Sequence, residues 1–318
     1  MKIASFNAKN FGEKKVKDKN VMKYFIEIIS RYDVIVMQEV MDKNNKVMGQ
    51  VLKKLNDTRC NRDRPFSLTS SSRLGRDTYK EQYVCLYREC EAALVDQHQY
   101  EDEQVGDEDV FEREPFSLLF RCPAAVVKDF VLITVHTKPK DTLEELEELN
   151  DVVDNVKENF GTNNIMIIGD FNADGRYISL KKLNKLPIRH PPYHWLIGDD
   201  IDTTSSNLND HTYDRIVVYG DAMLKAVVPN SAKPFNFQEE FDLSDEMVRH
   251  ISDHYPVEVE LKTVKRKTLA VPRIRKTTPK TTAARGKGPQ KKKPKGKPPK
   301  TQNVMGQKKG TKRRRLEN

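Results

Sequence analysis

The sequence predicts an α/β fold in which two β-sheets pack face to face, with helices on the outside of the sandwich. Eight short apolar runs indicate buried strands. They are too many and too irregularly spaced for a simple alternation of strand and helix. Two segments between them carry apolar residues at helical spacing, so we expect each helix to cover the outer face of a sheet. We predict that this sandwich spans residues 1–262.

The predicted strands are short runs rich in Val, Ile, Leu and aromatic residues. Their ranges are Ile3–Phe6, Val34–Met37, Tyr83–Tyr87, Phe116–Phe120, Phe130–Val135, Ile165–Ile168, Ile216–Tyr219 and Val257–Leu261. Continuous apolar runs of this length are typical of strands that are buried on both faces. No apolar segment of about 7–15 residues, as in a signal peptide, comes before the first strand.

The two predicted helices are recognised by apolar residues at steps of three and four. In the longer one these are Leu143, Leu146, Leu149, Val153, Val156 and Phe160. Thr142 is the expected N-cap, and Glu145 three residues later would complete a capping box. In the second helix the apolar residues are Val21, Met22, Phe25, Ile26 and Ile29.

Charge divides the chain into an acidic body and a basic tail. Residues 263–318 hold 21 Lys and Arg and one acidic residue, a net charge of +20, which leaves −11 for residues 1–262 out of a total of +9. The tail has no aromatic residue, so it lacks the apolar surface needed to offset its ordering entropy, and we expect it to be disordered.

The tail has two functional interpretations and one neutral one. It could be an electrostatic arm for a polyanion or, at Lys312–Arg315, a nuclear import signal. The neutral alternative is a solubilising appendage. An anionic membrane is a less favoured partner, because neither an amphipathic pattern nor a cysteine for lipid attachment accompanies the charges.

The cysteine spacing and the hydropathy of the sequence favour neither a zinc-binding protein nor a membrane-spanning one. Cys60, Cys85, Cys90 and Cys122 match no zinc-binding spacing, and if oxidised they would allow three pairings. We expect them to be reduced, buried thiols. The sequence contains no apolar run of about 18 residues, so we expect no membrane-spanning helix.

Polar residues of the kinds used in catalysis lie at the ends of most predicted strands. They are Asn7, Glu39, His136, Asp170, Asn172, Asp214, Asp253 and His254. Rigid strands hold such side chains in fixed positions, as a preorganised site requires. Asp170 and Asn172 are two residues apart and would point to the same face. Oxygen donors with few cysteines favour a hard cation, Mg²⁺ or Mn²⁺.

Several longer motifs support a family resemblance. They are Ser5–Asn7, Gln38–Glu39, Ser72–Tyr83, Arg113–Pro115, His136–Thr137, Gly169–Asn172, Tyr213–Val217 and Ser252–Val257. In this order and spacing the chain resembles the deoxyribonuclease I family of the endonuclease/exonuclease/phosphatase superfamily, and most of all its deoxyribonuclease gamma-like members. The stretch Ser72–Tyr83 is specific to deoxyribonucleases, whereas the motifs at Glu39, Asp170 and His254 are shared by the superfamily.

The resemblance implies an endonuclease that hydrolyses double-stranded DNA with little sequence specificity, needs a divalent metal ion and leaves 5′-phosphate ends. It would degrade DNA, for example during cell death. His136 and His254 would flank the scissile phosphate, one as general base and the other as general acid or phosphate clamp. Their roles stay open at this point. The catalytic set implied is Glu81, His136, Asp214, His254, Asp170 and Asn172.

Binding roles are implied as well. Asn7, Glu39 and Asp253 would hold the Mg²⁺ or Mn²⁺ ion. Arg113 would bind phosphate, Arg76 and Tyr79 would lie along the minor groove, and Tyr213 would also contact DNA. Relatives bind structural Ca²⁺ in two loops, which correspond to Glu101–Asp109 and Asp202–Thr204, so Glu101, Asp109, Asp202 and Thr204 are the candidate calcium ligands. Solvated acidic loops are the alternative.

Two departures from the family bear on location. Gly175 and His211 stand where the family has the cysteines of a structural disulfide, and the basic tail is longer. Both features favour a reducing compartment, so we expect a nuclear or cytoplasmic protein; a secreted one is the alternative if a signal peptide was removed before residue 1. The expected partners are double-stranded DNA and chromatin, with no membrane, and we expect a monomer.

Two other functions remain open from the sequence. The same catalytic residues could hydrolyse another phosphodiester or phosphomonoester, such as a phosphoinositide, sphingomyelin or abasic DNA. A catalytically inactive nucleic-acid-binding protein is the other alternative, although every expected catalytic position is filled.

Overall fold

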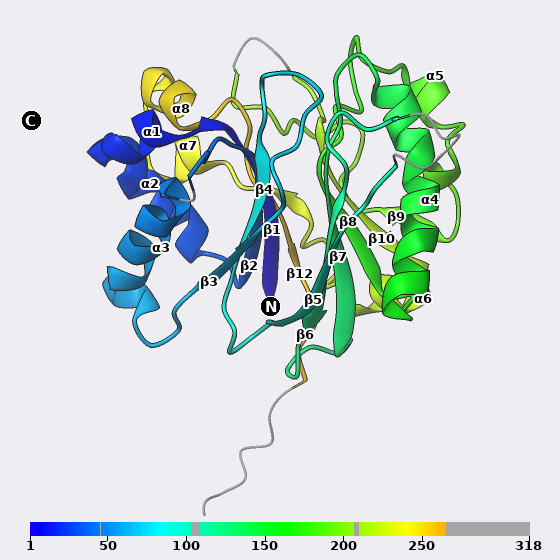
Figure 1. Ribbon diagram of the computed structural model, residues 1–318, viewed down its shortest axis with the longest axis horizontal. Helices are drawn as coiled ribbons and strands as arrows, with labels where there is room; N and C mark the ends of the chain where they lie inside the picture. Colours follow the sequence, from blue (N-terminus) through cyan, green and yellow to red (C-terminus); the bar gives the residue numbers. More distant parts are fainter. Residues whose placement is uncertain (45, 103–108, 207–209, 265–318) are drawn as a thin grey trace, which may run out of the picture. The chain divides into compact units, whose positions relative to one another are not determined.

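A computed structural model describes residues 1–44, 46–102, 109–206 and 210–264, which belong to one compact unit. Two six-stranded sheets lie next to each other, and helices cover the outer side of each (Figure 1). The predicted α/β sandwich of two sheets is therefore confirmed. Of the predicted disordered tail, residues 263–318, the first two are described and pair with residues 124 and 125, contrary to the prediction, and residues 265–318 lie outside the described residues.

The first sheet has the strand order β11-β12-β1-β2-β4-β3. Its strands are β1 (Lys2–Phe11), β2 (Val34–Val40), β3 (Ser67–Ser70), β4 (Gln82–Tyr87), β11 (Lys233–Pro234) and β12 (Val257–Glu260). Only β1 and β2 run parallel; the other neighbours are antiparallel. The parallel pair places the ends of β1 and β2 at the same edge of the sheet.

The second sheet has the order β5-β6-β7-β8-β10-β9. Its strands are β5 (Ala93–Gln99), β6 (Phe116–Arg121), β7 (Asp129–His136), β8 (Ile165–Asp170), β9 (Tyr193–Trp195) and β10 (Asp214–Tyr219). Here β7 and β8 are the parallel pair. Each sheet thus has a parallel pair at its centre, and antiparallel strands continue it on both sides.

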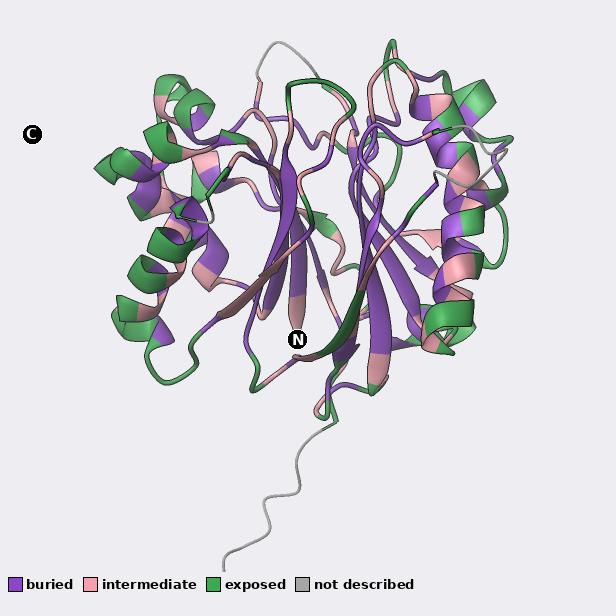
Figure 2. Ribbon diagram, in the orientation of Figure 1, coloured by how far each residue is buried: buried purple, intermediate pink, exposed green. Residues whose placement is uncertain are grey.

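Helices pack on the outer face of each sheet. Beside the first sheet are α1 (Glu13–Lys17), α2 (Lys19–Ser30), α3 (Val47–Asp57), α7 (Phe237–Glu240) and α8 (Asp245–Ile251); beside the second are α4 (Thr142–Phe160), α5 (Leu180–Leu183) and α6 (Gly220–Ala226). The central strands are buried almost throughout, whereas the edge strands β3 and β5 are partly exposed and each helix is exposed on its outer side (Figure 2). Residues of both sheets, among them Val34 and Ile168, form one apolar cluster between them.

Predicted and observed elements agree where the sequence is apolar and differ where it is polar. All eight predicted strands are present, and the two predicted helices are α2 and α4. The strands β3, β5, β9 and β11 were not predicted, because each is a short or polar edge strand. Helix α3 was not predicted either, because its sequence mixes apolar and basic residues.

The predicted capping box of α4 is wrong. The N-cap is Asp141, and Thr142 is already the first helical residue. The Glu145 carboxylate does not turn back to the cap; it accepts hydrogen bonds from the backbone of two other loops. At the other end of the predicted domain, Val264 N donates to Ala124 O at 2.8 Å, so ordered pairing continues two residues past residue 262.

The cysteines differ in part from the expectation. All four are free, but only Cys85 and Cys122 are buried, whereas Cys60 and Cys90 are exposed. Burial raises the pKa of the Cys122 thiol to about 12, which keeps it protonated and unreactive. In the part of the chain that the structure describes, no helix combines the length and apolarity needed to cross a bilayer.

Gly169 should be sensitive to substitution because the backbones of β7 and β8 approach closely there. Its φ is +155°, and a Cβ atom built on it would lie 1.8 Å from Val135 O. Gly169→Ala is therefore expected to lower the free energy of unfolding by about 2–3 kcal/mol or more, measured by urea denaturation. Gly49→Ala is the control, because nothing lies within 4 Å of a Cβ at that helical position. Equal stability of the two variants would contradict this view of the strand pair.

Candidate active site

Strand register brings three of the predicted catalytic residues into one row. His136 is the last residue of β7 and pairs with Asp170 at the end of the parallel strand β8. Asp214 opens the antiparallel strand β10 and pairs with Asp170 on the other side. The three side chains come from neighbouring strands of a buried sheet, so their spacing is fixed by backbone hydrogen bonds rather than by loops.

Two imidazoles meet at the central carboxylate of this row. His136 Nε2 lies 3.7 Å and His254 Nε2 3.8 Å from the same atom, Asp170 Oδ2. On the far side of each ring a second carboxylate contacts Nδ1: Glu81 Oε1 at 2.5 Å from His136 and Asp214 Oδ2 at 2.7 Å from His254. Both rings are thus held by Nδ1 and present Nε2 to a common point.

The pKa of His254 is strongly perturbed. Burial lowers it, but the negative charges of Asp214 and Asp170 and the hydrogen bond to Asp214 outweigh burial and raise it to about 10. Burial raises the pKa of Asp214, although His254 pulls it down. The pair therefore keeps a proton across the neutral range, with the imidazole as the cation.

His136 is perturbed in the same direction by a different balance. Burial and the neighbouring Arg113 lower its pKa, whereas the charge and hydrogen bond of Glu81 and the charge of Asp170 raise it, and the net shift is upward. In Glu81 itself burial raises the pKa, but His136 and Arg113 reverse this and hold it below the usual value. The positive charge of Arg113 thus opposes protonation of His136. No cationic side chain is among the groups that chiefly shift the pKa of His254.

A second group of oxygen donors lies at the ends of β1 and β2. Asn7 Nδ2 donates to Glu39 Oε1 and to Asp170 Oδ2, both at 3.0 Å, and so connects the two sheets. Glu39 has a φ of +56°, and its other oxygen accepts from Asn10 N at 2.8 Å. A non-glycine residue in this conformation is strained, which is common where a side chain must be aimed at a functional site.

The donor set fits a hard divalent cation. Carboxylate oxygens of Glu39 and Asp170 lie on either side of Asn7 Nδ2, while Asn7 Oδ1 accepts from Lys9 N, and a carboxylate oxygen of Asp170 and one of Asp214 lie within 4.8 Å of each other and of a His254 nitrogen. Carboxylate and amide oxygens are the ligands that Mg²⁺ and Mn²⁺ prefer. The predicted third ligand, Asp253, is not brought to this point: its carboxylate pairs with Lys9 Nζ at 2.8 Å and is 45 % exposed.

Arg113 and Asn172 are the predicted phosphate-side residues closest to the imidazoles. Arg113 is buried, and its Nε donates to His136 O at 2.9 Å. Its Nη2 is buried without a hydrogen-bond partner among the described residues. A buried guanidinium nitrogen left unpaired is costly, and a phosphate oxygen would satisfy it. Asn172 has a φ of +47° and donates Nδ2 to Thr137 O at 2.9 Å, which ties the loop after β8 to His136.

The other predicted DNA contacts lie around this centre. The Tyr213 ring is 6.2 Å from the His254 ring, and burial raises its pKa to about 12. Tyr79 is 40 % exposed, and its hydroxyl is 3.4 Å from Asn10 Oδ1. Arg76 is exposed, and its Nε lies 3.1 Å from Asp109 Oδ2; its minor-groove contact stays a prediction.

The candidate calcium loops are only partly described. Residues 103–108 of the first loop lie outside the described residues; Glu101 and Asp109 at its ends are exposed, and Asp109 pairs with Arg76. In the second loop Asp202 Oδ1 accepts hydrogen bonds from Thr204 N at 2.9 Å and from Thr204 Oγ1 at 2.7 Å. Calcium binding at both loops stays a prediction.

Three further residues support the site and were not assigned a role from the sequence. The Tyr83 hydroxyl accepts from His136 N at 3.0 Å and lies 3.3 Å from Arg113 O. Ser252 Oγ donates to Asn7 O at 2.7 Å and accepts from His254 N at 3.1 Å. Thr203 Oγ1 accepts from Asp214 N at 3.1 Å. Ser252 and Tyr83 both lie within motifs that the sequence analysis recognised, but an apolar strand sequence does not distinguish the role of Tyr83 from that of a core residue.

The two departures Gly175 and His211 fit each other. Gly175 has a φ of +60°, and a Cβ atom there would lie 2.8 Å from the His211 ring. The same ring stacks on Tyr213 with centroids 4.9 Å apart, and its Nδ1 is 3.3 Å from Asp174 Oδ2. A packed imidazole thus fills the space between the loops after β8 and before β10.

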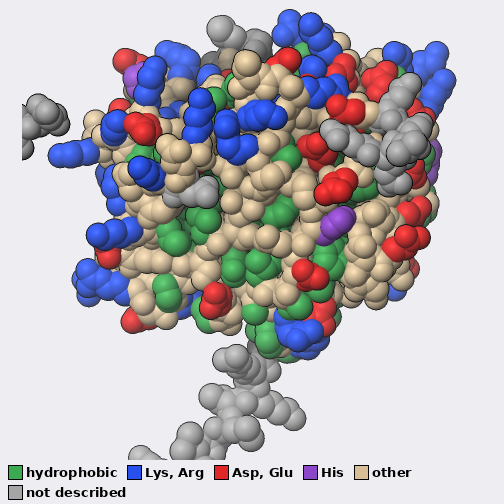
Figure 3. Space-filling view, viewed as in Figure 1, with side chains coloured by type: hydrophobic (Ala, Val, Ile, Leu, Met, Phe, Trp, Pro, Cys, Tyr) green, Lys and Arg blue, Asp and Glu red, His purple; other side chains and the backbone are tan. Residues whose placement is uncertain are grey.

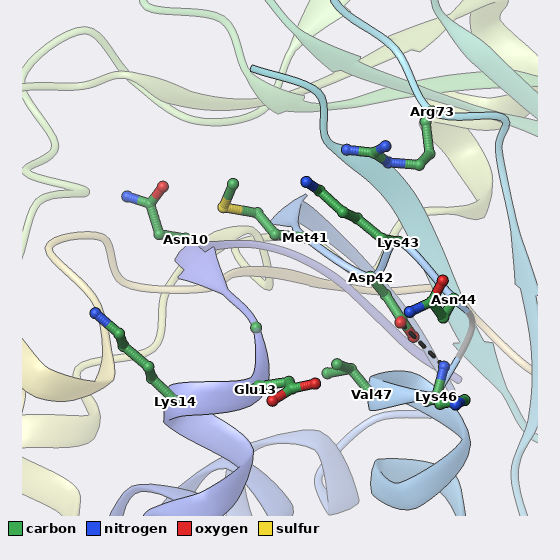
Figure 4. Close-up of a pocket in the computed structure, with 11 residues that line it drawn as sticks. Asn10, Glu13, Lys14, Met41, Asp42, Lys43, Asn44, Lys46, Val47 and Arg73 are labelled. Carbon is green, nitrogen blue, oxygen red and sulfur yellow. Dashed lines mark hydrogen bonds between the residues drawn. The ribbon is translucent and has the colours of Figure 1, made fainter. Parts of the chain in front are cut away.

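A basic hollow of about 480 Å³ adjoins the site. Asn10, whose backbone N–H donates to Glu39, is part of its wall. Figure 4 shows Lys43 and Arg73 extending in the same direction on one side of the hollow, with Lys14 on the opposite side. Lys and Arg side chains also gather along the upper part of the face shown in Figure 3. These residues are scattered in the sequence, so no run of charges revealed them.

Comparison with known proteins agrees with this geometry. Residues 4–254 match the model of the endonuclease/exonuclease/phosphatase family. Deoxyribonuclease gamma of Homo sapiens is 42% identical over 262 residues, which cover 82% of this chain and 86% of that protein. Deoxyribonuclease-1 of Oryctolagus cuniculus is 40% identical over 264 residues, 82% and 92% of the two chains.

Solved structures show the same fold at low sequence identity. The endonuclease/exonuclease/phosphatase from Bacteroides vulgatus superposes with a TM-score of 0.57 and 16% identity, over 82% of this chain and 98% of that one. The family match spans both sheets, and the identity to the two deoxyribonucleases extends over the same residues. The chain therefore belongs to the endonuclease/exonuclease/phosphatase family and, within it, to the deoxyribonuclease I family.

Proposed function

We propose that the protein is a divalent-metal-dependent endonuclease that hydrolyses phosphodiester bonds of double-stranded DNA and leaves 5′-phosphate ends. The observation that carries the proposal is the convergence of two carboxylate-backed imidazoles on Asp170. Two such groups on either side of one point can act on a phosphate placed between them, one on the attacking water and one on the leaving oxygen. The relatives named deoxyribonuclease support DNA as the substrate.

The two histidines take different roles in this proposal. His254, whose pKa is raised to about 10, stays protonated near neutral pH and donates a proton or hydrogen bond to the phosphate or its leaving oxygen. His136 lies beside the cationic Arg113, which opposes its protonation, and accepts the proton of the attacking water. Glu81 and Asp214 fix the tautomers through Nδ1.

Phosphate and metal are bound by separate residues. Glu39, Asp170 and Asn7 would hold a Mg²⁺ or Mn²⁺ ion, which when bound supplies positive charge to the phosphate as a Lewis acid. Arg113 binds a non-bridging oxygen through its unpaired Nη2. Tyr213 and Tyr79 flank the substrate, and neither can distinguish bases through a bidentate contact, which supports low sequence specificity.

Backbone contacts away from the scissile phosphate come from two sources. The basic hollow at Lys14, Lys43 and Arg73 lies beside the site and suits a flanking phosphate. The tail, residues 265–318, adds a dense positive charge to an acidic body. We further propose that the tail directs the protein to the nucleus and to chromatin, and that the enzyme acts as a monomer with Ca²⁺ in its two acidic loops.

Removing either imidazole should abolish nicking. His136→Ala and His254→Ala are each expected to reduce cleavage of supercoiled plasmid in Mg²⁺ by at least about a hundredfold, because general acid or base catalysis contributes that much. His250→Ala, an exposed residue of α8 four positions before His254, is the matched control and should cleave normally. EDTA should stop the wild-type protein. Full activity of either site variant would reject the assigned roles.

The charge of Glu81 should set the acidic limb of the pH–rate profile. Glu81 raises the pKa of His136, and His136 must be neutral to accept a proton, so activity falls as the pH drops through that pKa. Glu81→Gln is expected to lower the pKa and move the acidic limb of kcat/KM to lower pH, with a lower maximum. Glu89→Gln, exposed beyond the far end of β4, should leave the limb in place. An unmoved limb in Glu81→Gln would exclude His136 as the base.

The tail should dominate the salt dependence of DNA binding. Each phosphate contact that is lost reduces the slope of log affinity against log salt by about 0.9. Deletion of residues 265–318 is therefore expected to flatten the slope by several units, while cleavage of naked plasmid at low salt stays close to normal. Fluorescence anisotropy of a labelled duplex at a series of salt concentrations measures it. An unchanged slope would show that the tail does not touch DNA.

A further inference from the structure

Glu145 is a buried ionisable residue to which the proposed mechanism gives no role. It lies in the first two turns of α4 and is 0 % exposed. One oxygen, Oε1, accepts from Glu112 N at 3.1 Å and from Lys138 N at 3.2 Å. The other oxygen, Oε2, is buried without a hydrogen-bond partner among the described residues. A single carboxylate oxygen thus joins two loops that are 26 residues apart.

These two loops carry the phosphate-binding arginine and one catalytic imidazole. Glu112 directly precedes Arg113, and Lys138 follows His136 by two residues. The loops are also joined by the ion pair of Lys138 Nζ with Glu112 Oε2 at 2.7 Å, which is partly exposed and so contributes little by itself. A third link between these two segments is the hydrogen bond from Arg113 Nε to His136 O at 2.9 Å.

Stability alone does not account for a carboxylate at this position. An apolar side chain would leave the N–H groups of Glu112 and Lys138 without an acceptor, whereas an amide oxygen could accept from both without burying a charge. Burial raises the pKa of Glu145 to about 7, and the two backbone hydrogen bonds and the charges of Arg113 and His136 only partly offset it. The feature that serves the two loops is therefore the acceptor oxygen, Oε1, rather than the negative charge.

We infer that Glu145 is a positioning residue of the active site: its Oε1, hydrogen-bonded to Glu112 N and Lys138 N, sets the distance between Arg113 and His136. Arg113 then meets the phosphate at the point where His136 activates water. Without Glu145 both backbone N–H groups lose their acceptor, and the loop at Glu112 is free to move away from the loop at Lys138. The inference rests on the proposed nuclease function.

The decisive test is a double-mutant cycle of Glu145 with Arg113. Glu145→Ala is expected to lower kcat/KM for a short duplex by about tenfold in the wild-type background. In the Arg113→Ala background it should cost less than about threefold, because there is no guanidinium left to position. Glu145→Gln keeps an acceptor oxygen for both N–H groups and should stay within about threefold of wild type. Glu147→Ala, at an exposed position of the same helix, is the control and should be neutral in both backgrounds.

Stability and function are separated by the choice of variants. Each protein is assayed at least 15 °C below its own melting temperature, roughly the margin that keeps a destabilised variant folded. If Glu145→Ala does not fold, Glu145→Asp replaces it; one methylene shorter, it withdraws the oxygen from both N–H groups and should show the same loss. Equal losses in the two backgrounds, or a folded Glu145→Gln as impaired as Glu145→Ala, would overturn the inference. An inactive wild-type protein would instead refute the proposed nuclease.

Discussion

The active site depends on one shared carboxylate. Asp170 Oδ2 is the atom that both imidazoles approach and that the Asn7 amide contacts from the other sheet. Its position follows from backbone pairing, because Asp170 is in register with His136 on one side and with Asp214 on the other. The backbones of β7 and β8 approach each other so closely at Gly169 that there is no room for a side chain. Gly169 comes directly before Asp170, so this close approach lies next to the row of catalytic side chains. Catalytic geometry is therefore a property of the sheet.

This arrangement concentrates negative charge where a negatively charged substrate must bind. Asp170, Asp214 and Glu81 are all nearly fully buried, and the body of the chain is acidic overall. Cations must therefore be supplied locally: imidazolium and guanidinium groups inside the site, surface Lys and Arg at the rim, and the divalent ion that we propose for Glu39. This local supply of positive charge explains how an acidic domain can act on DNA. The electrostatic field inside the cleft acts on the bound phosphate, whereas the net charge of the domain affects only the long-range approach of DNA.

The sequence allowed the sheets and the site residues to be predicted, because both leave local signals. Apolar runs marked the strands, and His136, Asp170 and Asp214 follow or open such runs. Edge strands such as β5 were not predicted, because one face is solvated and their sequence is polar. Glu145 was assigned to a cap because helix-start patterns are local, whereas it accepts from Lys138 N, in the loop before the helix, and from Glu112 N, 33 residues away in the sequence. Contacts of this kind depend on tertiary packing, which no window of sequence reports.

The support around the imidazoles consists of polar groups buried at the ends of strands, and this has a thermodynamic consequence. Tyr83, Ser252 and Thr203 satisfy backbone N–H groups beside His136, His254 and Asp214, whereas Arg113 Nη2 has no partner among the described residues. An unpaired buried donor costs roughly 1–3 kcal/mol, and a phosphate oxygen placed against it recovers that energy on binding. Substrate binding should therefore stabilise the folded state as well as start the reaction. Arg113 itself lies in the loop before β6, but its Nε is hydrogen-bonded to His136 O at the end of β7, so in the proposed function the sheet preorganises the phosphate-binding guanidinium.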